Sequence, residues 1–315
     1  SAEARELAAR EQNVTTYADL RQALDDPAAR LIVIATPHDT HHDLVIQTLD
    51  AGKDCVVDKV MGLSTDEADR MIEARDRSRR VLSVFHNRRW DWDFLTIQQV
   101  LADQALGEPW LIESAVCRWS APRTWRGQRA AAGTILHDWG AHLIDQLLML
   151  GLGPCQQLQA WIQPAPWEGV DSGGHGVVEM RWEGCSRVRI EVSRVSPWER
   201  PRWFLLGSEG GLQKWGIDPQ EMALRAGDLD AAEEPPEHRA VVRRVRGDDI
   251  MEQPVPTSKG SWDGYYQNLA EVLEVGSPLV VTAEQGREVV RVLEAVTTSA
   301  ETGRILRGPW GSGLT

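Results

Sequence analysis

Apolar residues in the first ninety positions occur in short runs that are separated by segments of helical periodicity. The runs LIVIATP (31–37), DCVVDK (54–59) and VLSVF (81–85) have the length and the β-branched content of buried strands. Residues 41–51 and 65–78 carry apolar side chains every three or four positions, as an amphipathic helix does. Strands that alternate with helices predict a parallel sheet that is covered on both faces.

The pattern changes after the third strand. A helix is predicted near residues 91–105, a strand at 109–119 and a further helix at 133–150. Five strands then follow one another without intervening helices, which is typical of an antiparallel sheet. These strands are predicted near residues 157–163, 175–183, 186–194, 201–207 and 211–215. Two helices, at 262–275 and 282–301, close the chain.

These patterns predict an α/β plus α+β fold class in two domains. Residues 1–87 are expected to form an incomplete Rossmann-type, nucleotide-binding parallel domain, and residues 88–306 a domain with an open, mostly antiparallel sheet. The Gly-rich residues 307–315 are expected to be a flexible tail.

The front of the parallel domain lacks an expected motif. A domain that binds a dinucleotide normally opens with a strand and a G-x-G-x-x-G turn. This sequence opens with a predicted helix at residues 1–12 and contains no such turn. We therefore expect roughly thirty to forty further residues, one βαβ opening, to precede Ser1. The alternative is a real loss, in which the strands at 31–35 and 54–57 pair directly.

Composition narrows the classes of partner. The 315 residues carry a formal net charge of -13 at pH 7, so nucleic acid and anionic membranes, which bind basic surfaces, are not expected partners. No apolar run reaches the roughly 18 residues of a membrane span and no signal peptide is visible, which predicts a cytoplasmic protein. The four cysteines include no C-x-x-C pair and are expected to be free thiols. Fourteen tryptophans offer flat surfaces that suit sugar rings.

The predicted helix GTILHDWGAHLIDQLLML (133–150) carries three polar side chains among apolar ones. Asp138, His142 and Asp145 stand at positions i, i+4 and i+7, so regular helix geometry places them on one face. An imidazole that titrates near neutral pH beside a carboxylate suits proton transfer. The alternative is a purely structural hydrogen bond between Asp138 and His142.

A second polar segment, PHDTHH (37–42), contains His38, His41 and His42. Clustered histidines can bind a metal, so a metal-dependent hydrolase or lyase is an alternative function. The spacing matches no H-E-x-x-H pattern. We therefore expect no metal and assign these histidines to loop and helix-capping contacts.

Four stretches resemble one protein family. ATPHDTHHDLVIQTLDAGKDCVVDKV (35–60) is similar to the ATPNxxHxxxxxxALxAGKHVxxEKP stretch of the Gfo/Idh/MocA oxidoreductases, and residues 133–150 are similar to their GGxLxDxGxHxxD segment. VFHNRRW (84–90) resembles their GxNRRF turn, and residues 265–306 resemble their closing helices. The chain is therefore identified as a member of this family over about residues 14–306.

The resemblance implies an oxidoreductase in which NAD or NADP exchanges a hydride with a hydroxyl or keto group of a sugar, an inositol or a related polyol. Lys59, Asp138 and His142 match the family's catalytic Lys, Asp and His. Lys59 would donate a hydrogen bond to the reacting oxygen, and His142 would accept the hydroxyl proton. Asp138 would orient the imidazole or share its proton.

Two further sets of residues accompany this trio. The resemblance implies the cofactor-binding residues Thr36, Pro37, His38, His41, Asp58 and Lys59. The expected substrate-binding residues are Arg88, Trp119, Trp125, Trp139 and Asp145. The alternative for the tryptophans is core packing, and the alternative for the arginine is an ion pair at the domain junction.

The sequence departs from the family pattern at two places. The family's EKP reads Asp58-Lys59-Val60 here, and the GG before the Asp helix reads Ala132-Gly133. An alternative function is therefore a catalytically silent family member that binds a ligand or acts as a partner subunit. Helices are predicted on one face only of the second sheet, so the other face predicts a homodimer or homotetramer.

Overall fold

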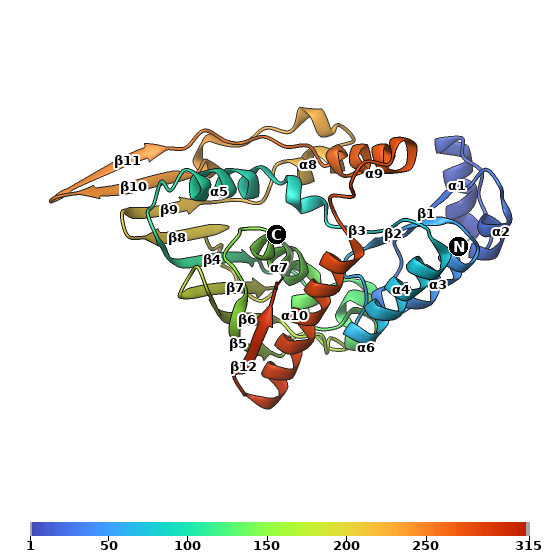
Figure 1. Cartoon of the computed structure of the whole chain (residues 1–315), viewed down its shortest axis with the longest axis horizontal. Coiled ribbons are helices and arrows are strands. Elements are labelled where there is room, and N and C mark those ends of the chain that lie inside the picture. The colour runs from blue at the N-terminus through green and yellow to red at the C-terminus, as the bar shows by residue number, and fades with distance from the viewer. Residues whose placement is uncertain (1, 313–315) are drawn as a thin grey trace.

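Two β-sheets of different size make up the structure (Figure 1). The computed structural model describes residues 2–312. The smaller sheet has three parallel strands in the order β1-β2-β3, which are Leu31–Ile34, Asp54–Asp58 and Leu82–Phe85. The predicted parallel sheet is confirmed, and β1 and β2 pair directly.

The smaller sheet is stabilised by its central strand, in which Cys55, Val56 and Val57 are fully buried. Helices α3 (His41–Asp50) and α4 (Thr65–Ser78) pack against each other beside the sheet. Parallel strands end at one edge of their sheet, so the loops that follow β1, β2 and β3 all begin at that edge. Helices α1 (Ala2–Gln12) and α2 (Leu20–Asp25) precede β1 and bury none of their residues.

The larger sheet has nine strands in the order β11-β10-β9-β8-β4-β7-β6-β5-β12. Neighbouring strands are antiparallel except for β4 and β7, which are parallel. The predicted open and mostly antiparallel sheet is therefore confirmed. Its strands are β4 Pro109–Cys117, β5 Cys155–Gln163, β6 His175–Trp182, β7 Arg187–Ser193, β8 Trp203–Gly207, β9 Gly210–Lys214, β10 Val241–Arg246, β11 Asp249–Pro254 and β12 Leu306–Trp310.

Two parts of the larger sheet differ from the sequence prediction. β10 and β11 form a hairpin that was not predicted, because charged residues obscure its alternation and every residue of β11 is exposed. The prediction of a flexible tail at 307–315 is wrong for residues 307–310. They belong to β12, which pairs with β5 and buries Trp310. The tail residues 313–315 lie outside the described part of the chain.

Helix α10 (Ala283–Thr302) connects the two sheets (Figure 1). It packs on β5 and β12 of the larger sheet and on β3 and α4 of the smaller domain. Its first turn is fixed by Thr282 and Gln285, whose side chains each accept a hydrogen bond from the other's backbone N–H. The other helices after β3 are α5 Trp92–Ala102, α6 Arg129–Ala132, α7 Ala141–Leu148, α8 Gln220–Arg225 and α9 Asp263–Val275.

The helix that was predicted at 133–150 is not continuous. Residues 136–140 form a π-helical turn, and α7 begins only at Ala141. Gly133 precedes this turn with a φ of 74°, a backbone conformation that glycine adopts at little cost. π-helical turns leave carbonyl groups free of the regular helical pattern and often occur at functional sites.

Within residues 2–312, no helix has the length and the apolar character that a membrane crossing requires. The four cysteines, Cys55, Cys117, Cys155 and Cys185, are buried free thiols, as predicted.

Candidate functional site

The carboxyl edge of the smaller sheet faces the π-helical turn. Lys59 directly follows β2, and its Nζ lies 2.8 Å from the carbonyl oxygen of Asp138 and 3.1 Å from Oδ1 of the same residue. The other carboxylate oxygen of Asp138, Oδ2, lies 2.5 Å from a guanidinium nitrogen of Arg194, which follows β7 of the larger sheet. The carboxylate of Asp138 therefore links the end of β2 in the smaller sheet to the end of β7 in the larger sheet.

The charge on this carboxylate depends on its two cationic partners. Burial alone would raise the pKa of Asp138, but Lys59 and Arg194 outweigh that effect and hold the pKa well below its usual range. Asp138 is therefore an anion at neutral pH, and the Lys59 ammonium group is held at a fixed position at the end of β2.

His142 lies in the first turn of α7 and is buried. Burial lowers its pKa well below 6.5, and the positive charges of Lys59 and Arg88 lower it further. The imidazole is thus neutral at physiological pH. Its ring packs edge-on against Trp139, with 5.8 Å between the ring centroids.

The expected contact between Asp138 and His142 is absent. Within the described residues, Nδ1 of His142 is buried and has no hydrogen-bond partner. Asp138 uses its carboxylate on Lys59 and Arg194 instead. The π-helical turn between the two residues replaces the regular i to i+4 geometry on which the expected pairing depended. The sequence-based role of Asp138 as the group that orients this imidazole is therefore wrong.

The loop after β1 is held by its histidines. His41 is fully buried, and its ring nitrogens lie 2.8 Å from the carbonyl oxygen of Val60 and 3.0 Å from that of Thr36. It thereby ties this loop to the loop that carries Lys59. His38 places Nδ1 3.0 Å from the carbonyl oxygen of Ala132, and burial followed by the charge of Lys59 lowers its pKa to about 3.

The structure distributes the remaining cofactor-site residues along this edge. Thr36 is exposed, Pro37 and Asp58 are half-buried, and Oδ1 of Asp58 accepts a hydrogen bond from the backbone N–H of Lys59. Trp125 packs edge-on against His38 at 4.8 Å between centroids, which brings it to the same edge.

The other expected substrate residues are exposed away from this edge or make structural contacts. Trp119 is 61% exposed and contacts Trp167. Trp139 is buried beneath the guanidinium group of Arg88, which lies 4.1 Å from its ring centroid. Arg88 also forms ion pairs with Asp91 and Glu221, so the ion-pair alternative is confirmed for this arginine, with both partners in its own domain.

Asp145 ties α7 to the turn after β3 and to the start of α10 through Arg89. Its carboxylate accepts hydrogen bonds from Nε and a terminal nitrogen of Arg89 at 2.9 and 2.6 Å. The same guanidinium group donates to the carbonyl of Val280 and to Oε1 of Gln285 at the start of α10. Asp145 is 2% exposed, and burial would raise its pKa but Arg89 keeps it lowered. The position of Asp145 is that of a structural ion pair.

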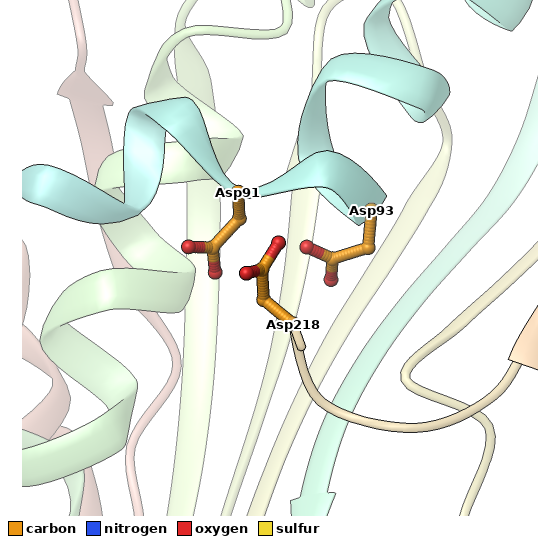
Figure 2. A group of neighbouring side chains, drawn as sticks. All are labelled: Asp91, Asp93 and Asp218. Atoms are coloured by element: carbon orange, nitrogen blue, oxygen red, sulfur yellow. The ribbon is translucent and has the colours of Figure 1, made fainter. Parts of the chain in front are cut away.

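The histidines of the 37–42 segment do not converge as metal ligands. In the described part of the chain, one group of three His, Cys, Asp or Glu side chains is close enough to share an ion, and it consists of Asp91, Asp93 and Asp218 (Figure 2). Figure 2 shows that Asp91 and Asp93 come from the start of α5, whereas Asp218 approaches from the loop before α8.

Hydrogen-bond donors already surround this acidic group. Asp91 accepts from Nε1 of Trp262, Asp93 accepts from Nε1 of Trp203, and Asp218 accepts from two backbone N–H groups. Arg202 pairs with Asp93 at 3.0 Å. Burial, followed by the charge of Asp93, raises the pKa of Asp218 to about 6, and burial raises the pKa of Asp91 well above its usual range. Through these contacts the group connects the loop before α8 to the start of α5.

A cavity of about 580 Å³ opens along α8. Its wall includes Arg118, Arg202, Asp218 and Glu221. Arg118 is half-buried, and burial together with the nearby Arg194 lowers its pKa. The cavity therefore lies on the side of the larger sheet from which Arg194 reaches the candidate site.

The sequence interpretation missed two residues of this site. Arg194 ends a predicted strand, but only the folded sheet shows that it reaches Asp138. His86 follows β3 directly and is 1% exposed, and both of its ring nitrogens lack hydrogen-bond partners within residues 2–312. The sequence feature that could have identified His86 is its position at the carboxyl end of a predicted parallel strand, where ligands bind in α/β sheets.

Comparison with known proteins agrees with this architecture. Residues 1–86 match the family described as "Oxidoreductase family, NAD-binding Rossmann fold", and residues 94–213 match the "GFO/IDH/MocA C-terminal domain". The chain is 32% identical over 295 residues to the scyllo-inositol 2-dehydrogenase (NADP(+)) IolW of Bacillus subtilis, with 91% of this chain and 81% of that protein covered. The chain belongs to the Gfo/Idh/MocA family of oxidoreductases.

Two other relatives extend the comparison. The oxidoreductase YdgJ of Escherichia coli is 32% identical over 292 residues, which cover 91% of this chain and 84% of YdgJ. The solved structure of yvaA from Bacillus subtilis superimposes with a TM-score of 0.88 at 29% identity and covers 96% of this chain and 88% of its own. The fold of this Gfo/Idh/MocA chain is thus shared over nearly its whole length.

The cofactor class of the family is NAD or NADP, and the carboxyl edge of the smaller sheet fits one end of such a molecule. Thr36 is exposed there and Lys59 is only partly buried, at the edge where ligands bind in α/β sheets. These two residues and the neighbouring Trp125 would hold the nicotinamide end. The sequence contains no G-x-G-x-x-G turn, so no residue is assigned to the pyrophosphate.

Asp145→Asn should destabilise the fold. The change leaves the buried Arg89 without its charged partner, and breaking a buried ion pair typically costs about 3 to 5 kcal/mol. Urea unfolding measures the difference. The matched control is Asp50→Asn, which breaks the exposed pair with Arg77 and should change the free energy by less than about 1 kcal/mol. Equal effects of the two substitutions would contradict the structural role of Asp145.

His137 should make the protein sensitive to acid. Its Nδ1 accepts a hydrogen bond from the N–H of Thr134, and burial lowers its pKa from 6.5 to about 4. The unfolded chain therefore takes up a proton at a higher pH than the folded chain, so stability is lost as the pH falls from 6.5 to 4. The substitution His137→Asn keeps a hydrogen-bond acceptor. Between pH 7 and 4.5 the free energy of unfolding of this variant should fall by about 2 kcal/mol less than that of the wild type. Urea unfolding at both pH values measures these losses, and an equal loss of unfolding free energy in the two proteins would refute the prediction.

Proposed function

We propose that this oxidoreductase transfers a hydride between NAD or NADP and a hydroxyl or keto group of a sugar, an inositol or a related polyol. The observation that carries the proposal is the placement of a fixed ammonium group, Lys59, beside a neutral buried imidazole, His142, at the carboxyl edge of a Rossmann-type sheet. Oxidation of an alcohol needs both groups, because a proton leaves the oxygen while negative charge develops on it.

Each residue has a distinct role in the proposed reaction. Lys59 donates a hydrogen bond to the reacting oxygen, and Asp138 with Arg194 keeps the ammonium group in place. His142 accepts the hydroxyl proton, which it can do because its lowered pKa leaves it neutral. The nicotinamide supplies the hydride acceptor when it is bound.

The substrate class is proposed from the surroundings of the site. Trp125 lies beside the loop of His38, and its ring, with the Arg126 guanidinium group 4.4 Å from its centroid, suits contact with a ring-shaped polyol. A relative that matches 91% of this chain is named for scyllo-inositol and NADP(+), so inositols are the first compounds to test. We also propose a cytoplasmic location.

The alternative of a catalytically silent family member has a distinct outcome. Asp58 and Val60 replace the family's Glu and Pro, yet Lys59 still reaches Asp138. A silent protein would bind NAD(P)H or a polyol in a titration without reducing or oxidising either. A screen of polyols with NAD and NADP, read by absorbance of the reduced nicotinamide, separates the two functions.

Lys59→Met should remove most of the activity and leave the fold intact, because Asp138 keeps its bond to Arg194. Loss of one group that stabilises the transition state costs about a hundredfold or more in kcat. Steady-state kinetics with the best polyol and thermal unfolding test both parts. The control Lys53→Met removes a lysine that bonds the carbonyl of Asp26 and should leave kcat unchanged. A kcat within about threefold of wild type for Lys59→Met would refute the assignment.

His142 should set the acidic limb of the pH profile. Because its pKa lies below 6.5, oxidation should rise with pH on the acid side of 6.5 and be level above it. His142→Asn should abolish this limb and leave the affinity for NADPH nearly unchanged. An unchanged limb in the variant would show that another group is the base.

We further propose that the chain forms a homodimer or homotetramer through the larger sheet. Opposite charges alternate on its uncovered face, where Arg187 pairs with Glu179 and Arg200 pairs with Glu191. A concave region on β8 to β11 adds apolar side chains that include Leu206, which is 39% exposed. Such a face is complementary to a second copy of itself.

Sedimentation tests the proposed assembly. The wild type should sediment as a dimer or tetramer at micromolar concentration, and Leu206→Arg should weaken or prevent association. A monomeric wild type would contradict the proposal.

A further inference from the structure

The base in the proposed reaction needs a defined tautomer. A neutral imidazole carries one hydrogen, and the hydrogen bond made by one ring nitrogen decides which nitrogen remains free to accept a proton. In His142 the nitrogen Nδ1 is buried and has no partner within residues 2–312, whereas Nε2 is not among the buried, unpartnered atoms. Nδ1 therefore points into the protein, and the partner that fixes it has to come from the interior.

Neither of the two carboxylates nearest to His142 on its own helix and turn accepts a hydrogen bond from Nδ1. Both oxygens of Asp138 are held by Lys59 and Arg194. Asp145 lies on the same side of α7, three residues after His142, but both of its oxygens are bound by Arg89.

His86 lies beside this turn of α7. Its Nδ1 is 3.8 Å from Oδ2 of Asp145, which is too long for a hydrogen bond but orients an N–H toward the carboxylate. Both ring nitrogens are buried and without partners in the described part of the chain. Asp145 follows His142 by three residues on α7, so these two side chains lie on the same side of the helix and the ring of His86 lies next to the turn that carries His142.

Two buried imidazoles with three unpartnered nitrogens are unusual, because buried polar atoms are nearly always hydrogen-bonded. A single water molecule can bridge such groups at little cost. The lone pair on Nε2 of His86 is the acceptor that remains once its Nδ1 hydrogen faces Asp145.

We propose that His86 is the positioning residue that fixes the tautomer of His142. In this arrangement one water molecule accepts the hydrogen on Nδ1 of His142 and donates to Nε2 of His86. Nε2 of His142 is then unprotonated and is the nitrogen that accepts the proton of the substrate. The inference rests on the proposed function, in which His142 is the base.

The arrangement explains how the base stays neutral. A carboxylate bonded to Nδ1 would raise the pKa of His142, whereas an uncharged imidazole does not. The charged and titratable groups around His142 are Lys59, Arg88, Arg202 and His86, and those around His86 are Asp145, Arg89, Lys59 and Asp58. When His142 accepts the hydroxyl proton on Nε2, its Nδ1 hydrogen stays bonded toward His86. The carbinol C–H electrons leave as hydride, and the C=O bond forms.

The tautomers can be observed without any substrate. Long-range ¹H–¹⁵N spectra of the full chain with ¹⁵N-labelled histidine, at pH 7.5, report the hydrogen on each ring nitrogen. His142→Asn and His86→Phe assign the two signals by their loss. The wild type should show the Nδ1–H tautomer for both His142 and His86. An Nε2–H tautomer for His142 would overturn the proposal, and the tautomer itself is read from the unmodified protein.

Substitutions of His86 test whether this residue fixes the tautomer of His142. His86→Phe should convert His142 to a mixture of tautomers and lower kcat by roughly tenfold or more, with KM and the affinity for NADPH within about twofold. His86→Gln, whose carbonyl can accept the same hydrogen, should restore the Nδ1–H tautomer and most of kcat. The matched control His137→Asn changes another buried histidine and should leave the tautomer of His142 unaltered. A pure Nδ1–H signal for His142 in His86→Phe would overturn the proposal.

The two proposals fail in different ways. If the spectra show the expected dependence on His86 and no polyol is oxidised, the proposed function is wrong and the positioning role stands. If polyols are oxidised and the tautomer of His142 does not change in the His86 variants, the positioning role is wrong and the function stands.

Discussion

The site depends on one buried carboxylate, that of Asp138, which is shared by two cations from different sheets. Lys59 comes from the end of β2, and Arg194 comes from the end of β7. Burial of a lone carboxylate would favour its protonated form, and the two cations reverse that preference. The same contact holds Lys59 at the carboxyl edge of the smaller sheet and links the smaller domain to the larger sheet.

The geometry of the following helix is consistent with this contact. The π-helical turn at 136–140 leaves the carbonyl of Asp138 free to accept a hydrogen bond from Lys59. It also turns the Asp138 side chain away from His142, so the base is surrounded by cations and a second imidazole. Burial and, after it, the nearby positive charges lower the pKa of His142 and keep it neutral, which is the state that a proton acceptor requires.

Much of the fold could be predicted from the sequence, because short apolar runs and helical periodicity report burial directly. The Asp138 and His142 positions also followed from their pattern, since helical spacing is a local property. Contacts between distant segments could not be predicted in this way. Arg194 reaches Asp138 only through the pairing of β7 in the larger sheet, and β12 becomes ordered only by pairing with β5. The π-helical turn separated Asp138 from His142, and nothing in the local spacing predicts it.

The most direct test of this account is a single-turnover measurement of hydride transfer in Asp138→Asn. The asparagine keeps the size of the side chain and removes the charge that holds Lys59 and Arg194 in place. A misplacement of a reacting group by about 1 Å can cost roughly a hundredfold in rate, so the rate of nicotinamide reduction by the polyol should fall at least that far while NADP binding persists. A hydride-transfer rate within about threefold of wild type would show that the shared carboxylate does not organise the site.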